Sequence, residues 1–278
     1  MKKRFVNVAV CQRAATGATS EENTADSMEM IERAAGMAPD LDVVLLPECN
    51  NFIASDHSRW PGAAQSIPGP YTDAMADLAK KLHVNLIPGS MTETGGNGKV
   101  RNTAVFINRE GEILGRYTKI HLFDALGHEE SEHAEAGDRV CVLDTDFGRI
   151  GIQICYDIRF PELARTQVLG GADILFVMAC FPGGDALPPR TDHWDLLIDA
   201  MALQNQTWVC AANQYGSICG GREHPFGRSR ITDPWGTPVA VAGNHKDIIL
   251  ARLDLEFAET CKKSIGGLHN RRAELYQI

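Results

Sequence analysis

Short runs of apolar and β-branched residues recur along the chain, separated by polar turns or by longer segments with apolar residues at helical spacing. Runs of this length and composition are typical of buried strands. The strands that they predict are Phe5–Cys11, Val43–Leu46, Val84–Ile87, Thr103–Ile107, Ile113–Tyr117, Ile150–Cys155, Ile174–Met178, Trp208–Ala212, Arg230–Thr232, Val239–Val241 and Ile248–Leu253.

Start and stop signals of helices mark several of the longer segments. Thr19 and Glu22 have the spacing of a capping box, in which each side chain bonds to the backbone of the other residue. Pro161 suits the first turn of a helix, and Gly170 with its neighbouring glycine suits the end of one. The predicted helices are one that begins after Thr19, Tyr71–Leu82, Pro161–Gly170 and Thr191–Asn205.

Two turn sequences, 108–111 and 233–236, indicate hairpins that add antiparallel strands to this pattern. Strands that alternate with helices and also form hairpins predict a mixed sheet covered by helices. Two such sheets back to back, each with helices outside, would hold this many elements, so we expect an α/β fold arranged as a four-layer α-β-β-α sandwich. No linker rich in Pro, Gly or Ser divides the chain, which predicts a single domain over residues 1–278.

The composition argues against several classes of protein. The net charge is −9, and there is no basic stripe of the kind that binds nucleic acid. No apolar run approaches the roughly 20 residues that span a bilayer, and the first apolar stretch ends too early for a secretory signal. The 8 cysteines have no dense spacing pattern, and most lie in or beside apolar runs. We therefore expect reduced thiols and a cytoplasmic protein without nucleic-acid or membrane partners.

Three residues with catalytic chemistry stand where predicted strands end. Cys155 ends one strand and precedes a helix, so its thiol can project from the sheet edge toward free backbone N–H groups. Glu48 and Lys119 each follow another strand. Taken alone, each has a more ordinary explanation: a buried core thiol, a surface-loop carboxylate, and a lysine that reaches solvent or a counter-charge. Their shared placement indicates one crevice, because open α/β sheets bind ligands at the carboxyl ends of strands.

The segments around these three residues resemble the signature segments of the nitrilase superfamily of carbon–nitrogen hydrolases. They stand in the family's order, and the resemblance runs through nearly the whole chain. Residues 227–236 resemble a late family segment, and residues 269–276 resemble a common ending of its amidase branches. The three signature segments are Leu45–Glu48, Gly115–Leu122 and Ile154–Leu163.

This resemblance implies a fold, an assembly and a reaction. The family fold is an α-β-β-α sandwich, and its members usually form homodimers or larger homo-oligomers. Cys155 would be the nucleophile and Glu48 the proton acceptor and donor, while Lys119 and the backbone N–H of Tyr156 would hold the oxyanion. A small carboxamide would be cleaved to an acid and ammonia through a thioester, with no metal and no organic cofactor.

A second glutamate is common in the loop after the lysine of this family. The resemblance places it at Glu130, because of the spacing to a later Gly-Asp pair, with Glu129 as the rival. Arg190 could hold a substrate carboxylate as a bidentate fork, unless it is an ordinary surface residue. The other residues expected to bind the substrate are Phe52, Tyr156 and Phe181.

The sequence leaves the substrate open between two classes. The segment from Phe181 to Trp194 resembles the N-carbamoyl-amine hydrolases, whereas the ending resembles the simple amidases. The alternative reaction is therefore hydrolysis of an N-carbamoyl amine or N-carbamoyl amino acid, with release of ammonia and carbon dioxide. The same thioester could instead pass its acyl group to an amine or alcohol, which would make the protein an acyltransferase.

Two further interpretations concern residues near the site. Arg159 and Glu162 are expected to form a structural ion pair that holds the turn after the nucleophile. His121, His128 and His133 allow a zinc interpretation together with a nearby glutamate. No C-x-x-C or H-E-x-x-H spacing supports it, so we expect no metal at this site.

Overall fold

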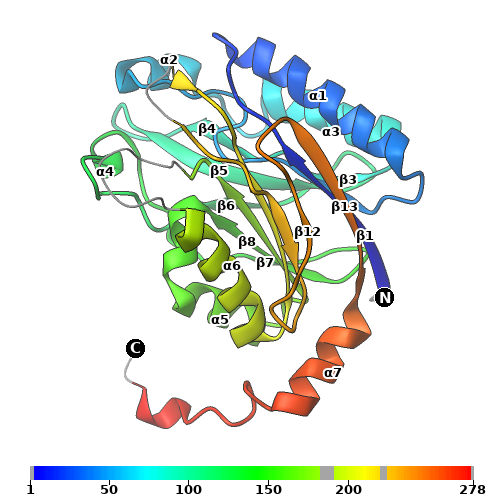
Figure 1. Ribbon diagram of the computed structural model, residues 1–278. Helices are drawn as coiled ribbons and strands as arrows, with labels where there is room; N and C mark the ends of the chain where they lie inside the picture. The colour runs from blue at the N-terminus through cyan, green and yellow to red at the C-terminus, as the bar shows by residue number, and fades with distance from the viewer. Residues whose placement is uncertain (1–2, 182–190, 220–223, 277–278) are drawn as a thin grey trace.

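The computed structural model describes residues 3–181, 191–219 and 224–276, and its strands form two sheets (Figure 1). The first sheet holds, in spatial order, β13 (Asp247–Asp254), β1 (Phe5–Gln12), β2 (Val43–Leu45), β3 (Asn85–Ile87), β5 (Val100–Ile107) and β4 (Ser90–Thr94), with β6 (Ile113–Thr118) also paired to β5. The second sheet holds β12 (Pro238–Val241), β11 (Arg230–Thr232), β10 (Trp208–Asn213), β9 (Ile174–Ala179), β8 (Arg149–Ile154) and β7 (Val142–Asp144).

Helices join the parallel strands, because parallel pairing requires a long crossover instead of a tight turn. In the first sheet, α1 (Ser20–Met37) connects β1 to β2, and α3 (Pro70–Leu82) connects β2 to β3. In the second sheet, α5 (Pro161–Leu169) connects β8 to β9, and α6 (Thr191–Asn205) connects β9 to β10. Other helical elements of the described residues are η1 (His57–Arg59), α2 (Trp60–Ala63), α4 (Glu130–His133), η2 (Cys155–Arg159), α7 (Leu255–Ile265) and η4 (Ala273–Leu275).

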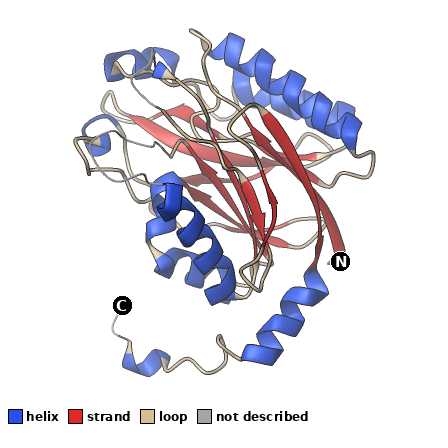
Figure 2. Cartoon of the chain, in the orientation of Figure 1, coloured by secondary structure: helices blue, strands red, loops and turns tan. Residues whose placement is uncertain are grey.

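Three hydrophobic clusters separate four layers of structure. The central cluster lies between the sheets and takes residues from both, among them Val8 and Phe106 of the first sheet and Ile152 and Phe176 of the second. A second cluster packs α1 and α3 onto the first sheet, and a third packs α5 and α6 onto the second. Figure 2 shows these helices on the outer faces of the strands. The predicted α-β-β-α sandwich is therefore confirmed.

The helix signals in the sequence act as expected. The hydroxyl of Thr19 accepts a hydrogen bond from the backbone N–H of Glu22 at 3.2 Å, and the Glu22 carboxylate accepts from the N–H of Thr19 at 3.4 Å. Helix α5 begins at Pro161 and is capped by Gly170. The capping box and the proline–glycine pair are thus confirmed as the boundaries of α1 and α5.

The predicted strands all form, with small shifts at their ends, but the strands β4 and β7, the helix α7 and the short helical turns have no counterpart in the prediction. Strand β4 is largely polar, and β7 is short. Helix α7 follows β13 without a break, because the Asp254 side chain ends the strand and accepts a hydrogen bond from the N–H of Glu256 at 3.0 Å. Hydrophobic periodicity detects long amphipathic elements best, which explains why β4 and β7 were not predicted.

The C-terminal segment leaves the body of the sandwich after α7 (Figure 1). Leu275 and Tyr276 are exposed there, at 64% and 51% of their surface. In the ranges that the structure describes, no helix has both the length and the hydropathy needed to cross a membrane.

Candidate active site

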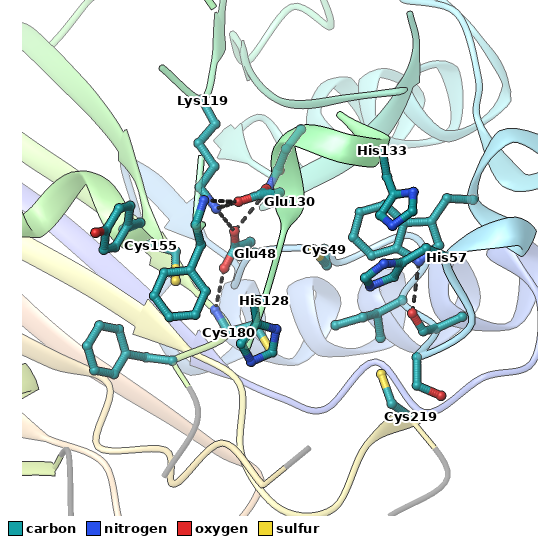
Figure 3. Close-up of a pocket in the computed structure, with 18 of the residues that line it drawn as sticks. Glu48, Cys49, His57, Lys119, His128, Glu130, His133, Cys155, Cys180 and Cys219 are labelled. Atoms are coloured by element: carbon teal, nitrogen blue, oxygen red, sulfur yellow. Dashed lines mark hydrogen bonds and ion pairs between the residues drawn. The ribbon is translucent and has the colours of Figure 1, made fainter. Parts of the chain in front are cut away.

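The structure brings the three strand-end residues into one pocket (Figure 3). Glu48 lies just beyond β2 and Lys119 directly after β6, both in the first sheet, whereas Cys155 directly follows β8 of the second. The pocket therefore lies where strand ends of the two sheets meet. This placement requires the sandwich, because neither sheet alone supplies all three side chains.

Glu48 is a buried carboxylate, 4% exposed, with several donors around it. Its Oε1 atom accepts hydrogen bonds from Lys119 Nζ at 3.3 Å and from Asn102 Nδ2 at 2.9 Å. Its Oε2 atom accepts from the backbone N–H of Cys180 at 2.7 Å. Charge-assisted bonds of this kind offset the cost of burying a carboxylate and fix its orientation.

Lys119 is equally buried, and its ammonium bridges two carboxylates. Besides Glu48, Nζ donates to the two carboxylate oxygens of Glu130 at 3.1 and 2.7 Å. Burial by itself lowers the pKa of a lysine, but the charges of Glu48 and Glu130 outweigh it and hold the pKa of Lys119 well above its ordinary value. Lys119 is therefore a fixed positive charge inside the pocket.

Cys155 occupies a strained turn that directs its thiol into the pocket. It is the first residue of η2 and has a φ of +48°, a left-handed conformation that costs free energy for any residue other than glycine. Burial raises the pKa of the Cys155 thiol well above its ordinary value, and the Glu48 carboxylate, which accepts a hydrogen bond from the thiol, raises it further. The nearby Lys119 opposes this shift. Cys155 therefore rests as a protonated thiol beside a carboxylate that can take its proton.

Geometry distinguishes between the two candidates for the second glutamate. Glu130 begins α4, bonds to Lys119, and also accepts a hydrogen bond from the backbone N–H of Phe123 at 2.7 Å. Glu129 precedes it as an exposed residue and makes no side-chain capping bond. The arrangement favours Glu130 over Glu129 as the second acidic residue of the site.

Two close approaches fix the backbone around Glu48. Gly89 has a φ of +77°, and a Cβ atom there would lie 2.0 Å from the carbonyl oxygen of Pro47 and 2.7 Å from the Cβ of Asn50. A glycine is therefore required where the chain leaving β3 passes the residue before Glu48. From the other sheet, Gln214 Nε2 donates to the backbone carbonyl of Glu48 at 2.7 Å.

Only some of the residues predicted to bind the substrate line the pocket. Tyr156 and Phe181 line the pocket. Phe52 is buried and does not line it, whereas the next residue, Ile53, does. Arg190 lies outside the described residues. The structure thus places two of the four predicted side chains at the site.

Arg159 lies in the pocket instead of pairing with Glu162, so the predicted ion pair is wrong. Its guanidinium carbon lies 5.2 Å from the centroid of the Phe181 ring. Glu162 is exposed in the first turn of α5. Arg159 is half-buried and has no carboxylate partner in the part of the chain that the structure describes.

Sequence reasoning missed His57 and Trp60 in the pocket wall and considered His128 and His133 only as zinc ligands. His57, Trp60, His128 and His133 line it, and the rings of His57 and His133 lie 4.4 Å apart between centroids. Burial and the two neighbouring imidazoles lower the pKa of His57. Within 3–181, 191–219 and 224–276, no group of three or more potential ligands is arranged to hold a metal ion. Further thiols in the wall are those of Cys49, Cys180 and Cys219.

The model of the carbon–nitrogen hydrolase family matches residues 7–263. The chain belongs to this family. Among other members, omega-amidase NIT2 of Xenopus tropicalis is 34% identical over 262 residues, which are 92% of either chain. Omega-amidase NIT3 of Saccharomyces cerevisiae is 31% identical over 280 residues, which are 98% of this chain and 94% of that one.

Solved structures of carbon–nitrogen hydrolases have the same fold. Saccharomyces cerevisiae Nit3, a member of branch 10 of the nitrilase superfamily, matches with a TM-score of 0.86 at 28% identity, over 98% of this chain and 97% of that one. The NitFhit protein of Caenorhabditis elegans matches with a TM-score of 0.91 at 31% identity, over 100% of this chain and 67% of that one. The resemblance noted in the sequence is therefore confirmed.

Proposed function

We propose that this carbon–nitrogen hydrolase cleaves a small carboxamide to an acid and ammonia. In this proposal Cys155 is the nucleophile, Glu48 the general base and acid, and Lys119 a donor to the oxyanion. The observation that carries it is that one carboxylate, Glu48, contacts both the thiol of Cys155 and the ammonium of Lys119. Membership of the family and the omega-amidase relatives support the class of reaction.

The first half-reaction acylates the enzyme. Because burial keeps Cys155 protonated, Glu48 takes the proton as the sulfur attacks the amide carbon. The oxyanion that forms is held by Lys119 and by the backbone N–H of Tyr156. Glu48 then returns the proton to the leaving nitrogen, the C–N bond breaks, ammonia departs, and a thioester remains on Cys155.

The second half-reaction uses the same carboxylate on water. Glu48 takes a proton from a water molecule, the water oxygen attacks the thioester carbon, and the C–S bond breaks. The sulfur regains the proton from Glu48, and the acid leaves. While Glu48 is protonated, Glu130 is still bonded to Lys119, which gives the second glutamate of the site a role as counter-charge.

Arg159 suggests the kind of amide. A half-buried guanidinium on the pocket wall, without a carboxylate partner in the described chain, is suited to a carboxylate or another anionic group of the substrate. We therefore favour a monoamide of a small dicarboxylic acid. N-carbamoyl amino acids also carry a carboxylate and remain the alternative substrate.

The test is release of ammonia and carbon dioxide from two matched panels, dicarboxylic monoamides and N-carbamoyl amino acids. Ammonia alone from the first panel, lost in Cys155→Ala, is the expected result. Ammonia with carbon dioxide from the second panel would assign the alternative reaction. Acyl transfer to an added amine in place of hydrolysis would make the protein an acyltransferase.

We also propose that the protein forms a homodimer through the outer faces of α5 and α6. Leu196 is 67% exposed, Leu169 51% and Leu203 45%, which is an unusual concentration of apolar surface on two neighbouring helices. Light scattering should give twice the chain mass of 30.4 kDa for the wild type and a shift toward the single chain for Leu196→Glu. A monomeric wild type would contradict the proposal.

Two further expectations belong to this proposal. Residues 1–278 should unfold as a single domain in one transition, because the two sheets share a central core. All eight cysteines are free thiols, which supports the expected cytoplasmic location, where disulfides are rare.

A further inference from the structure

Asp157 lies two residues after the nucleophile and is 0% exposed. Its Oδ2 atom accepts hydrogen bonds from the backbone N–H of Ile154 at 2.8 Å and from the Tyr117 hydroxyl at 2.7 Å. Its Oδ1 atom contacts the backbone N–H of His121 at 3.3 Å and the ring Nδ1 of His121 at 2.8 Å. A carboxylate has about four acceptor positions, so protein groups occupy all of them.

The protonation states in this cluster follow from its partners. Burial and the charge of Asp157 raise the pKa of Tyr117 far above its ordinary value, so the phenol stays a donor. An ionised Asp157 only accepts hydrogen bonds, which assigns a proton to Nδ1 of His121. The cluster is therefore one buried acceptor surrounded by donors.

The cluster connects the two halves of the catalytic centre. Tyr117 and His121 flank Lys119 in the segment that ends β6 of the first sheet. Ile154 and Asp157 flank Cys155 in the segment that ends β8 of the second sheet. The His121 ring also stacks on Phe160, with 3.7 Å between centroids and 6° between planes, at the far end of the same turn. His121 thus holds η2 at two points.

This connection acts on a strained element. The left-handed conformation of Cys155 persists only if its surroundings enforce it. Asp157 bonds back to the N–H of Ile154 and closes the turn around the nucleophile. Neither Asp157 nor its side-chain donors Tyr117 and His121 line the substrate pocket. An effect on catalysis must therefore pass through the positions of Cys155 and Lys119.

We propose that Tyr117, His121 and Asp157 are positioning residues, which set the thiol of Cys155 in register with Glu48 and Lys119. This role rests on the proposed function, because positioning matters only if the site hydrolyses an amide. The reactivity of Cys155 can nevertheless be measured without a substrate that is hydrolysed. It assigns a role to three side chains that touch neither the substrate nor the reacting atoms.

Three variants separate the parts of the cluster. Tyr117→Phe removes one hydroxyl, and His121→Phe removes the Nδ1–H while keeping an aromatic ring against Phe160. His121→Asn returns an N–H donor near the Nδ1 position. Thr207→Val is the matched control, because it removes a buried hydroxyl that donates to the Asp173 carbonyl at 2.8 Å, beyond the opposite end of β10.

We expect both Phe variants to lower kcat about 10- to 100-fold, the range caused by misplacing a reacting group by about 1 Å, with KM within about twofold of wild type. Alkylation of Cys155 by iodoacetamide should slow in step, since the thiol loses its alignment with Glu48. His121→Asn should recover most of both rates, and Thr207→Val should keep both.

The proposal would be overturned if both Phe variants kept the kcat and the Cys155 alkylation rate of the wild type. An equal loss in Thr207→Val, which would show that general stability is responsible, would also overturn it, as would a rise in KM with unchanged kcat. If wild type cleaves no amide, the proposed function fails on its own, while the alkylation rates still decide the positioning role.

Discussion

Replacing Lys119 by methionine removes the ammonium that both acidic residues of the site contact. The side chains of Glu48 and Glu130 are only 5% and 12% exposed, so solvent screens the uncompensated negative charge only weakly. The net charge of the three side chains falls from −1 to −2. Removing one partner of a buried ion pair costs about 3–5 kcal/mol. We expect Lys119→Met to lose about this much free energy of unfolding at neutral pH, together with its activity.

A second substitution shows whether charge is the cause. Lys119→Met/Glu130→Gln returns the net charge to −1, so it should regain about half of the lost stability or more, but no activity.

The assay is urea denaturation at neutral pH, with ammonia release measured in parallel. Lys81→Met is the control, since it breaks a 2.7 Å ion pair with Glu32 in which both side chains are exposed. It should change the free energy of unfolding by less than about 1 kcal/mol. The reasoning is refuted if Lys119→Met stays within about 1 kcal/mol of wild type, or if the double variant is no more stable than the single one.

Three other predictions follow from the site. The rate of Cys155 alkylation should keep rising with pH beyond about 8.5, the ordinary thiol pKa, because burial and Glu48 raise the pKa of this thiol; a plateau below that pH in peptide mapping would contradict it. Gly89→Ala should cost about 3 kcal/mol or more in denaturation, since its Cβ would meet a backbone oxygen at 2.0 Å. Gly98→Ala, with the same φ of +77° but open space, should cost only about 1–2 kcal/mol. Arg159→Met should raise KM about 10-fold or more for an anionic amide, but leave a neutral amide of the same size unchanged; equal effects on both would remove the anion-binding role.

The layers of the fold and the three strand-end residues could be predicted because both depend on short-range patterns. The alternating run Ile150-Gly-Ile-Gln-Ile predicts a buried strand, and the end of that strand fixes where the next side chain, Cys155, projects. Glu48 and Lys119 follow strands in the same way, but their convergence with Cys155 depends on how the two sheets pack together. Glu130 needed more, and spacing alone left Glu129 as a rival until the contacts with Lys119 distinguished them.

Other features depend on geometry that the sequence pattern does not carry. The expected ion pair between Arg159 and Glu162 would hold the turn after the nucleophile, but η2 ends at Arg159 in the pocket wall and α5 begins at Pro161 with Glu162 exposed. Strand β4 escapes a hydrophobic pattern because it buries polar groups. Its Glu93 is 5% exposed and accepts a hydrogen bond from Thr103 Oγ1 at 2.6 Å.

The central claim is that Cys155 carries the acyl group during turnover. The most direct measurement is the intact mass of the protein after an acid quench during turnover of a dicarboxylic monoamide, followed by peptide mapping. The account predicts an added mass equal to the amide minus ammonia, located on Cys155, released by hydroxylamine and absent from Cys155→Ala, which should be inactive. Amide hydrolysis that continues at the wild-type rate in Cys155→Ala would contradict it.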